Sequence, residues 1–308
     1  MTIRQFIKKQ SFISVPLYRL YLWYLFKKRS ARTFILYKLV EFMRSMIIKN
    51  DVESVRVGKD FAELTFYGNS FYWNPKERDS LLGIGLSGTY EKKEIASMVR
   101  FLKPGMVVFD IGGNFGLHTM IFAEHVGSSG HVYSFEPLKH IYEEHIKNIA
   151  LNGYTNIVTA NNLALGNRHG KEKIYIASEL GTGASSLRKR WSGKNIVQYC
   201  ELLPLDAFIN KQKIKQVDFI KCDVEGAELL VFKGGIKTLE KNKPIIFFEA
   251  IDNHTKLFNY SVEEEMEFLR SFSYEFYVLH GTTIKKATSL AAGNFYALTK
   301  EHIKEYKL

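Results

Sequence analysis

The sequence of 308 residues contains only two cysteines, Cys200 and Cys222. A secreted domain held together by disulfides would need more, so we expect a reducing compartment. Cys222 lies in the strand-like run VDFIKC, where a buried and unreactive thiol is expected. The chain also lacks a cysteine and histidine cluster with zinc spacing. With 46% hydrophobic residues, an ordinary globular core is the expected source of stability.

Long apolar runs are also lacking. Arg19 interrupts the first aromatic-rich stretch, and residues 20–26, which follow it, fall far short of the roughly 20 residues that span a bilayer. The same region has neither the clean apolar core nor the small-residue cleavage site of a secretory signal. Internal repeats and low-complexity tracts are absent as well. We therefore expect a cytoplasmic protein.

Charge is unevenly distributed. The net charge is +11, yet residues 1–50 hold eleven Lys or Arg and one acid, which leaves a balance of only +1 for the other residues. This basic segment also carries Trp23, Tyr24 and Phe26. One interpretation is a helical extension that packs on the main domain or on a second subunit. Another is a peripheral helix at the inner membrane face, with the aromatics among headgroups and Lys27 and Lys28 near anionic lipid. Basic residues with aromatics can also follow a nucleic acid backbone, which we do not expect here.

The rest of the chain divides into two parts. Residues 51–75 alternate in polarity and predict two or three short strands with a turn at Gly68-Asn69. From residue 88 onward, strand-like and helix-like segments alternate, which predicts a doubly wound, mostly parallel α/β sheet of Rossmann-like type. The expected organisation is a basic helical extension over 1–50, a small β segment over 51–87 and the main domain over 88–308. Within that domain, residues 178–195 are interpreted as a loop and 226–242 as one helix containing Gly234-Gly235.

A glycine turn follows the first strand of the main domain, in the pattern Asp110-x-Gly112-x-Asn114-x-Gly116. Glycines allow a tight turn whose backbone N–H groups approach a ligand closely. The spacing differs from the dinucleotide pattern G-x-G-x-x-G, and a pyrophosphate near Asp110 would meet like charge. S-adenosylmethionine carries an ammonium and a sulfonium group and no phosphate, so it suits this acid better. A tight turn with no ligand remains the alternative.

Two polar positions follow the next two strands. Glu136 in YSFEP can accept hydrogen bonds from both hydroxyls of a ribose, a role that dinucleotide folds share. Asn162 in NNLALG lies within reach of an adenine edge, or serves only as a turn residue. Both lie at the carboxyl edge of the expected sheet, where ligands of open α/β sheets bind.

Acids gather at the same edge further along the chain. Asp223 and Glu225 have period-two spacing after a strand, so both can point into the crevice. Such a pair can supply a general base with a raised pKa or bind Mg²⁺. Glu249 ends the next strand, and Glu228 is expected to place its charge in the first turn of a helix.

The ordered set of these motifs resembles the FkbM family of S-adenosylmethionine-dependent methyltransferases. The resemblance covers about residues 88–250 and is carried by VVFDIGGNFGLHT, YSFEP, NLALG, GTGASSL, LPLDAF, VDFIKCDVEGAELLVFKGG and IIFFEA. It implies a class I methyltransferase fold and O-methylation of sugars or natural products. It also implies cofactor contacts for Asp110, Gly112, Asn114, Gly116 and Glu136, to which we add Gly113, Asn162 and Asp223. The family turn usually has alanine where this chain has Gly113, a change that should be tolerated.

The resulting hypothesis is an S-adenosylmethionine-dependent O-methyltransferase that acts on a sugar, glycan or glycolipid hydroxyl. Glu225 is the first candidate for the general base, followed by Asp223 and His118. No resident metal is expected, with Mg²⁺ on the Asp223 and Glu225 pair as the alternative. N-methylation usually needs an N-P-P-Y-like turn where this chain has DVEG, so oxygen is the expected acceptor atom. A non-catalytic, membrane-associated binding module and an NAD-dependent oxidoreductase remain open alternatives.

Within this loop, the stretch GTGASSLRKRW (181–191) is interpreted as a substrate lid. Its basic residues Arg188, Lys189 and Arg190 would meet an acidic or phosphorylated acceptor, or would simply form a solvated surface.

Overall fold

The fold was analysed in a computed structural model of the chain. It describes residues 37–38, 40–41, 52–57, 62–73, 91–177, 181–190, 195–289 and 292–308. Almost all of the basic segment 1–50, with its predicted helix and membrane contact, lies outside these residues. No helix within the described ranges is long and apolar enough to cross a membrane.

The central element is an eight-stranded sheet with the order β14-β13-β15-β12-β11-β4-β5-β6. Strands β6, β5, β4, β11 and β12 pair in parallel, whereas β15, β13 and β14 add antiparallel pairs at one side. The strands are β4 (Val107–Ile111), β5 (His131–Phe135), β6 (Val158–Asn161), β11 (Phe219–Cys222), β12 (Ile245–Ala250), β13 (Glu275–His280), β14 (Thr283–Lys286) and β15 (Gly293–Leu298). The predicted α/β fold of class I methyltransferase type is confirmed.

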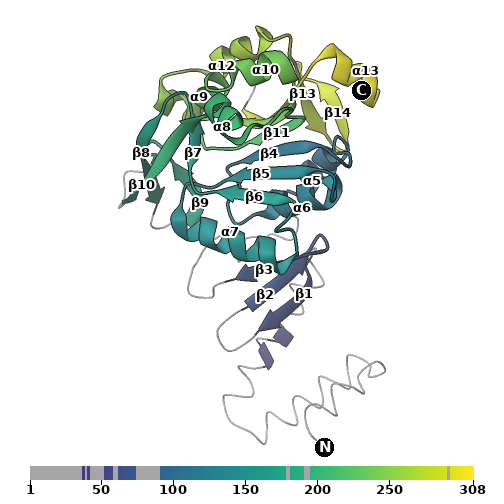
Figure 1. Cartoon of the computed structure of the whole chain (residues 1–308), viewed down its shortest axis with the longest axis vertical. Coiled ribbons are helices and arrows are strands. Elements are labelled where there is room, and N and C mark those ends of the chain that lie inside the picture. Colours follow the sequence, from purple (N-terminus) through teal and green to yellow (C-terminus); the bar gives the residue numbers. More distant parts are fainter. Residues whose placement is uncertain are drawn as a thin grey trace, which may run out of the picture.

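Helices cover both faces of this sheet, as Figure 1 shows. One face carries α5 (Lys92–Val99), α6 (Leu117–Val126) and α7 (Lys139–Leu151). The other carries α8 (Leu205–Gln212), α9 (Glu228–Lys233), α10 (Ile236–Asn242) and α12 (Val262–Arg270). Short segments complete the chain, namely α11 (Asp252–Thr255), η2 (Lys256–Phe258) and α13 (Lys300–Tyr306).

The parallel strands are buried on both faces because successive side chains point to opposite sides. In β4, Val108 belongs to the core beneath α5 and α6, and Phe109 belongs to the core beneath α8 and α9. In β11, Phe219 and Ile220 divide in the same way. Each of these strands therefore packs against two hydrophobic cores. This packing holds β4 and β11 in place, and with them the turns that follow at their carboxyl ends.

Two smaller sheets flank the domain. β1 (Val52–Val57), β2 (Ala62–Phe66) and β3 (Asn69–Trp73) form the predicted antiparallel meander, which packs on α7 through β3. A four-stranded sheet contains β7 (Ala164–Gly166), β8 (Gly170–Ala177), β9 (Gly181–Ser186) and β10 (Asn195–Pro204). The loop prediction for 178–195 is thus wrong over Gly181–Ser186, which pairs with β8. Its many glycines and serines gave no strand signal.

The predicted single helix over 226–242 is also two helices. α9 ends at Lys233 and α10 begins at Ile236. A Cβ on Gly235 would approach Leu205 Cδ2 to 2.6 Å, and a Cβ on Gly234 would collide with the carbonyl oxygen of Gly166. The glycine pair therefore allows β7 and α8 to pack closely against the junction between α9 and α10. The helix is interrupted at this junction.

Candidate active site

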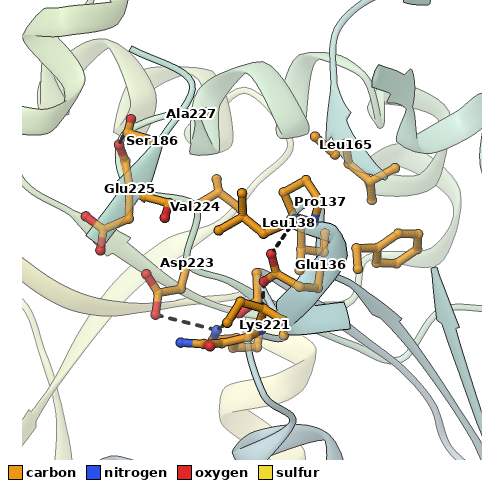
Figure 2. Close-up of a pocket in the computed structure, with 18 of the residues that line it drawn as sticks. Glu136, Pro137, Leu138, Leu165, Ser186, Lys221, Asp223, Val224, Glu225 and Ala227 are labelled. Atoms are coloured by element: carbon orange, nitrogen blue, oxygen red, sulfur yellow. Dashed lines mark hydrogen bonds and ion pairs between the residues drawn. The ribbon is translucent and has the colours of Figure 1, made fainter. Parts of the chain in front are cut away.

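A cavity of about 250 Å³ opens at the carboxyl ends of β4, β5, β11 and β12. This position is the switch point of the sheet, where the chain turns from β4, β5 and β6 to the other side with β11. Figure 2 shows Glu136, Pro137 and Leu165 on one side of the cavity and Asp223 and Glu225 on the other. We call the first the donor side and the second the acceptor side.

The glycine turn after β4 forms the cavity floor. Gly112 and Gly116 have φ values of 83° and 101°, and Asn114 has a φ of 48°, all in the left-handed region. A Cβ on Gly112 would collide with the carbonyl oxygen of Asp223. The turn after β4 and the turn after β11 can thus approach only because residue 112 is glycine.

Glu136 follows β5 and is almost fully buried on the donor side. Its Oε2 accepts a hydrogen bond from the Asn114 N–H at 3.1 Å, and its Oε1 accepts one from the Leu138 N–H at 2.8 Å. Burial raises the pKa of Glu136 to about 7, although both hydrogen bonds lower it. Each carboxylate oxygen retains acceptor capacity toward the cavity.

Asp110 lies behind this floor. It is fully buried, and its Oδ2 accepts a hydrogen bond from Thr119 Oγ1 at 2.5 Å. Lys221 Nζ lies 3.6 Å from Asp110 Oδ1 and 3.5 Å from Asp223 Oδ2, and it donates to the Gly112 carbonyl at 2.9 Å. Burial lowers the pKa of Lys221, but the charges of Asp223 and Asp110 outweigh it and raise the pKa. Lys221 therefore joins the two turns electrostatically.

The turn after β11 carries the acids of the acceptor side. Burial raises the pKa of Asp223, and Lys221 opposes the shift. Burial and the charge of Asp223 raise the pKa of Glu225 to about 7, against the effect of Arg190. Glu225 has a φ of 60°, an uncommon conformation for a residue other than glycine.

Glu228 lies in the first turn of α9, as the sequence predicted, and its side chain also binds the turn after β11. Its side chain is buried, and its Oε1 accepts hydrogen bonds from the N–H groups of Val224 at 2.8 Å and Gly226 at 3.3 Å. Burial raises its pKa to about 8, so the carboxyl group is protonated at neutral pH. Its carbonyl-type oxygen still accepts both bonds.

The acceptor side is closed by residues from three further segments. Arg190 donates hydrogen bonds to Glu225 Oε2 and to His254 Nε2. His254 Nδ1 lies 3.2 Å from Glu249 Oε2 and 3.4 Å from Glu225 Oε2. Ser186 Oγ donates to the Glu225 carbonyl at 3.0 Å. The end of β9 and the segment after it are therefore joined to the turn that carries Glu225.

A histidine and carboxylate pair completes the cavity wall. His118, in the first turn of α6, places Nε2 at 3.0 Å from Glu91 Oε2. Both residues line the cavity. Glu91 precedes α5 with a φ of 51°.

The comparison with protein families decides the assignment. The family model described as "Methyltransferase FkbM domain" matches residues 110–276, which is more than half of the chain and includes both turns of the site. The chain belongs to the FkbM methyltransferase family. The methyl donor of this family is S-adenosylmethionine.

Curated relatives of this FkbM-family chain match over shorter stretches. A protein-L-isoaspartate O-methyltransferase of Methanothrix thermoacetophila is 41% identical over 56 residues, which are 18% of this chain and 27% of the relative. The enzyme of the same name from Methanothermobacter thermautotrophicus is 34% identical over 82 residues, which are 26% of this chain and 38% of the relative. The match thus spans well under half the length of either relative.

Solved structures with similarity include a methyltransferase FkbM from Methylobacillus flagellatus. It is 16% identical with a TM-score of 0.42, over 63% of this chain and 43% of that chain. An O-methyltransferase from Bacillus cereus in complex with SAH is 15% identical with a TM-score of 0.40, over 73% of this chain and 84% of that chain.

Most of the sequence-predicted site residues of this FkbM-family chain meet in the one cavity. Those that line it are Gly112, Gly113, Asn114, His118, Glu136, Asp223 and Glu225. Asp110, Gly116 and Asn162 are not among the described lining residues. Asp110 lies 3.6 Å from Lys221 Nζ behind the cavity, and Gly116 is the N-cap residue of α6.

Asn162 has a different environment from the one predicted. Its Nδ2 donates to the backbone carbonyls of Glu136 at 2.9 Å and Pro137 at 3.1 Å, so its amide is used within the protein. Apolar side chains line the cavity there instead, among them Leu163 and Leu165. An adenine ring would therefore be enclosed by apolar contacts.

Four features of the site were not predicted from the sequence. They are Glu91, Lys221, His254 and the contact of Arg190 with Glu225. Lys221 interrupts an otherwise apolar strand, which is a usable signal because a buried lysine needs a carboxylate partner. Glu91 and His254 carried no such signal, since each lies among other polar residues near a helix start.

The donor side fits the methyl donor of the family. Glu136 presents a buried carboxylate toward the cavity, and neighbouring apolar residues can enclose a flat ring. Gly112, Gly113 and Asn114 of the glycine turn line the same cavity.

Proposed function

We propose that this protein transfers the methyl group of S-adenosylmethionine to a hydroxyl oxygen of a sugar, glycan or glycolipid-type acceptor. The observation that carries the proposal is the division of one cavity into two chemically different sides. The donor side has the glycine turn, Glu136 and an apolar slot, and the acceptor side has four carboxylates from three segments. These are Glu91, Asp223, Glu225 and Glu249.

On the donor side, Glu136 would hold the ribose hydroxyls, and the backbone of Gly112 and Asn114 would lie against the donor. The bound donor supplies an electrophilic methyl group. A buried carboxylate that accepts hydroxyl protons must be ionised, which ties donor binding to the pKa of Glu136 at about 7.

On the acceptor side, carboxylates can accept hydrogen bonds from neighbouring hydroxyl groups of a sugar. We place Asp223 ahead of Glu225 as the group that accepts the acceptor proton. The Asp223 side chain is 37% exposed and lines the cavity, whereas Glu225 is engaged by Arg190 and His254. Alignment of the oxygen contributes as much as roughly 7–11 kcal/mol, and a general base typically adds about 10²- to 10⁴-fold.

The position of the arginines argues against an acidic or phosphorylated acceptor at this end. Arg190 pairs with Glu225, and Arg188 stacks on the Phe258 ring at 5.0 Å from its centroid. The carboxylates that line the cavity would repel an anion, and they suit a neutral acceptor rich in hydroxyl groups.

The test is methyl transfer from labelled S-adenosylmethionine to a panel of neutral glycosides, sugar nucleotides and glycolipids, with the full chain. We expect label on a neutral hydroxyl acceptor and at least about a hundredfold loss of turnover in Asp223→Asn. Donor binding without transfer to any member would favour a non-catalytic binding module.

A further inference from the structure

Three residues on the acceptor side gather from three separate segments. Glu225 lies in the turn after β11, Glu249 lies near the end of β12, and His254 lies in α11. One ligand atom from each lies within 4.8 Å of the others. The set shares Glu225 with the Asp223 and Glu225 pair that the sequence suggested for Mg²⁺, and it differs from that pair by including Glu249 and His254.

The separations are those of ligands around one divalent ion. Oxygen and nitrogen ligands bind such ions at about 2.1 Å, so two ligand atoms lie roughly 3.0 Å apart at a right angle and roughly 3.4 Å apart at the tetrahedral angle. His254 Nδ1 lies 3.2 Å from Glu249 Oε2 and 3.4 Å from Glu225 Oε2. Two carboxylates with one imidazole suit Mn²⁺, Fe²⁺ or Zn²⁺.

The positively charged side chain of Arg190 already contacts two of these three residues. The Arg190 guanidinium donates hydrogen bonds to Glu225 Oε2 and His254 Nε2. A guanidinium can only donate, so His254 Nε2 must accept, and the hydrogen of the neutral ring lies on Nδ1, facing the two carboxylates. A metal ion on Nδ1 would require that hydrogen on Nε2, where it would oppose Arg190.

We propose that Glu225, Glu249 and His254 form a divalent-cation site, which Arg190 occupies in the absence of the ion and leaves when the ion binds. Ion binding and the Arg190 contact then exclude each other, because both need Glu225 and opposite tautomers of His254. Release of Arg190 would also remove one of the two contacts that join β9 and the segment after it to Glu225, and the bond from Ser186 would remain.

Glu225 and Glu249 line the cavity, so the ion would face the acceptor. It would have positions left for two neighbouring oxygens of a polyhydroxylated acceptor, and it would acidify a bound hydroxyl group. This consequence rests on the proposed methyltransferase function, whereas the ion site itself does not.

The test uses Mn²⁺ and the full chain without substrates. Calorimetry should show one Mn²⁺ per chain, and the pulsed electron paramagnetic resonance spectrum of the bound ion should show coupling to an imidazole nitrogen. His254→Phe and Glu249→Gln should each weaken binding by about tenfold or more, and His254→Phe should remove the coupling. Arg190→Gln should tighten binding, because the competing cation is lost.

Arg188→Gln is the matched control, because this arginine is in the same segment but stacks on Phe258. It should bind Mn²⁺ as the unaltered chain does. Circular dichroism and S-adenosylhomocysteine binding would show that each variant is folded. Absence of Mn²⁺ binding in both the unaltered chain and Arg190→Gln would overturn the proposal, and so would unchanged affinity in His254→Phe. S-adenosylhomocysteine binding that persists in that case would leave the proposed function standing.

Discussion

His145 of α7 fills the space beside Gly113, since a Cβ on Gly113 would come within 2.9 Å of His145 Cε1. Ser134 Oγ lies closer still to that position. The methyl group of the alanine usual in the family is thus replaced here by two neighbouring side chains. The space that a methyl group at position 113 would need is therefore already filled in this chain.

Gly113→Ala should consequently destabilise the protein. Overpacking of this kind costs about 1–3 kcal/mol, measured as the free energy of unfolding in urea. Gly293→Ala is a suitable control, because a Cβ there meets nothing within 4 Å. Adding Ser134→Ala to Gly113→Ala should recover part of the loss. If Gly113→Ala were as stable as Gly293→Ala, the packing around the turn would be different from the one described.

His145 also predicts a loss of stability in acid. Burial lowers its pKa from the ordinary 6.5 to about 4, partly opposed by the charge of Asp110. The unfolded chain therefore takes up a proton that the folded chain resists, so stability present above pH 6.5 is lost as the pH falls toward 4. The loss amounts to about 3 kcal/mol. Urea unfolding between pH 7 and pH 4 should show a smaller loss for His145→Gln than for the unaltered chain. An equal loss of stability in both proteins would contradict the lowered pKa of His145.

Glu136 predicts that donor binding depends on pH. Because burial raises its pKa to about 7, the carboxyl group becomes protonated below pH 7 and accepts hydroxyl protons poorly. S-adenosylhomocysteine affinity should fall by up to about tenfold per pH unit below 7. In Glu136→Gln this dependence should be absent, because the amide does not titrate. A pH profile shared by both proteins would mean that another group controls binding.

At position 228, we expect that an uncharged glutamine can replace the glutamate. Its pKa of about 8 means that a protonated carboxyl group holds Val224 and Gly226 at neutral pH. Glu228→Gln should therefore retain most of the free energy of unfolding at pH 7, whereas Glu228→Ala should lose about 1–3 kcal/mol. Relative to Glu228→Gln, the unaltered chain should lose stability as the pH rises from about 4.5 toward 8, because the folded state resists ionisation, and the difference should level off above pH 8. The opposite order would show that Glu228 is held as a carboxylate.

Much of the architecture could be predicted from the sequence because the parallel strands are buried on both faces and read as short apolar runs. The turn after β4 and the acids after β11 followed from their positions at strand ends. The strand Gly181–Ser186 could not be predicted, since its residues have low strand propensity and it forms by pairing with β8. Lys221 and Arg190 were missed as partners because their contacts join segments distant in sequence.

The same limit applies to individual roles. Asp110 was expected to meet the ligand, but β4 places it beneath the turn, where Lys221 and Thr119 use its carboxylate. A strand-end pattern predicts the edge at which a side chain lies. It does not predict whether that side chain faces the cavity or the layer behind it, which depends on packing.

The most direct test of the central claim is calorimetric titration of the full chain with S-adenosylhomocysteine at pH 8, where Glu136 is ionised. The account predicts one binding site per chain and an affinity at least about tenfold weaker in Glu136→Gln, because a charged acceptor of the ribose hydroxyls is lost. Absence of binding to the unaltered chain, or equal binding by Glu136→Gln, would contradict it.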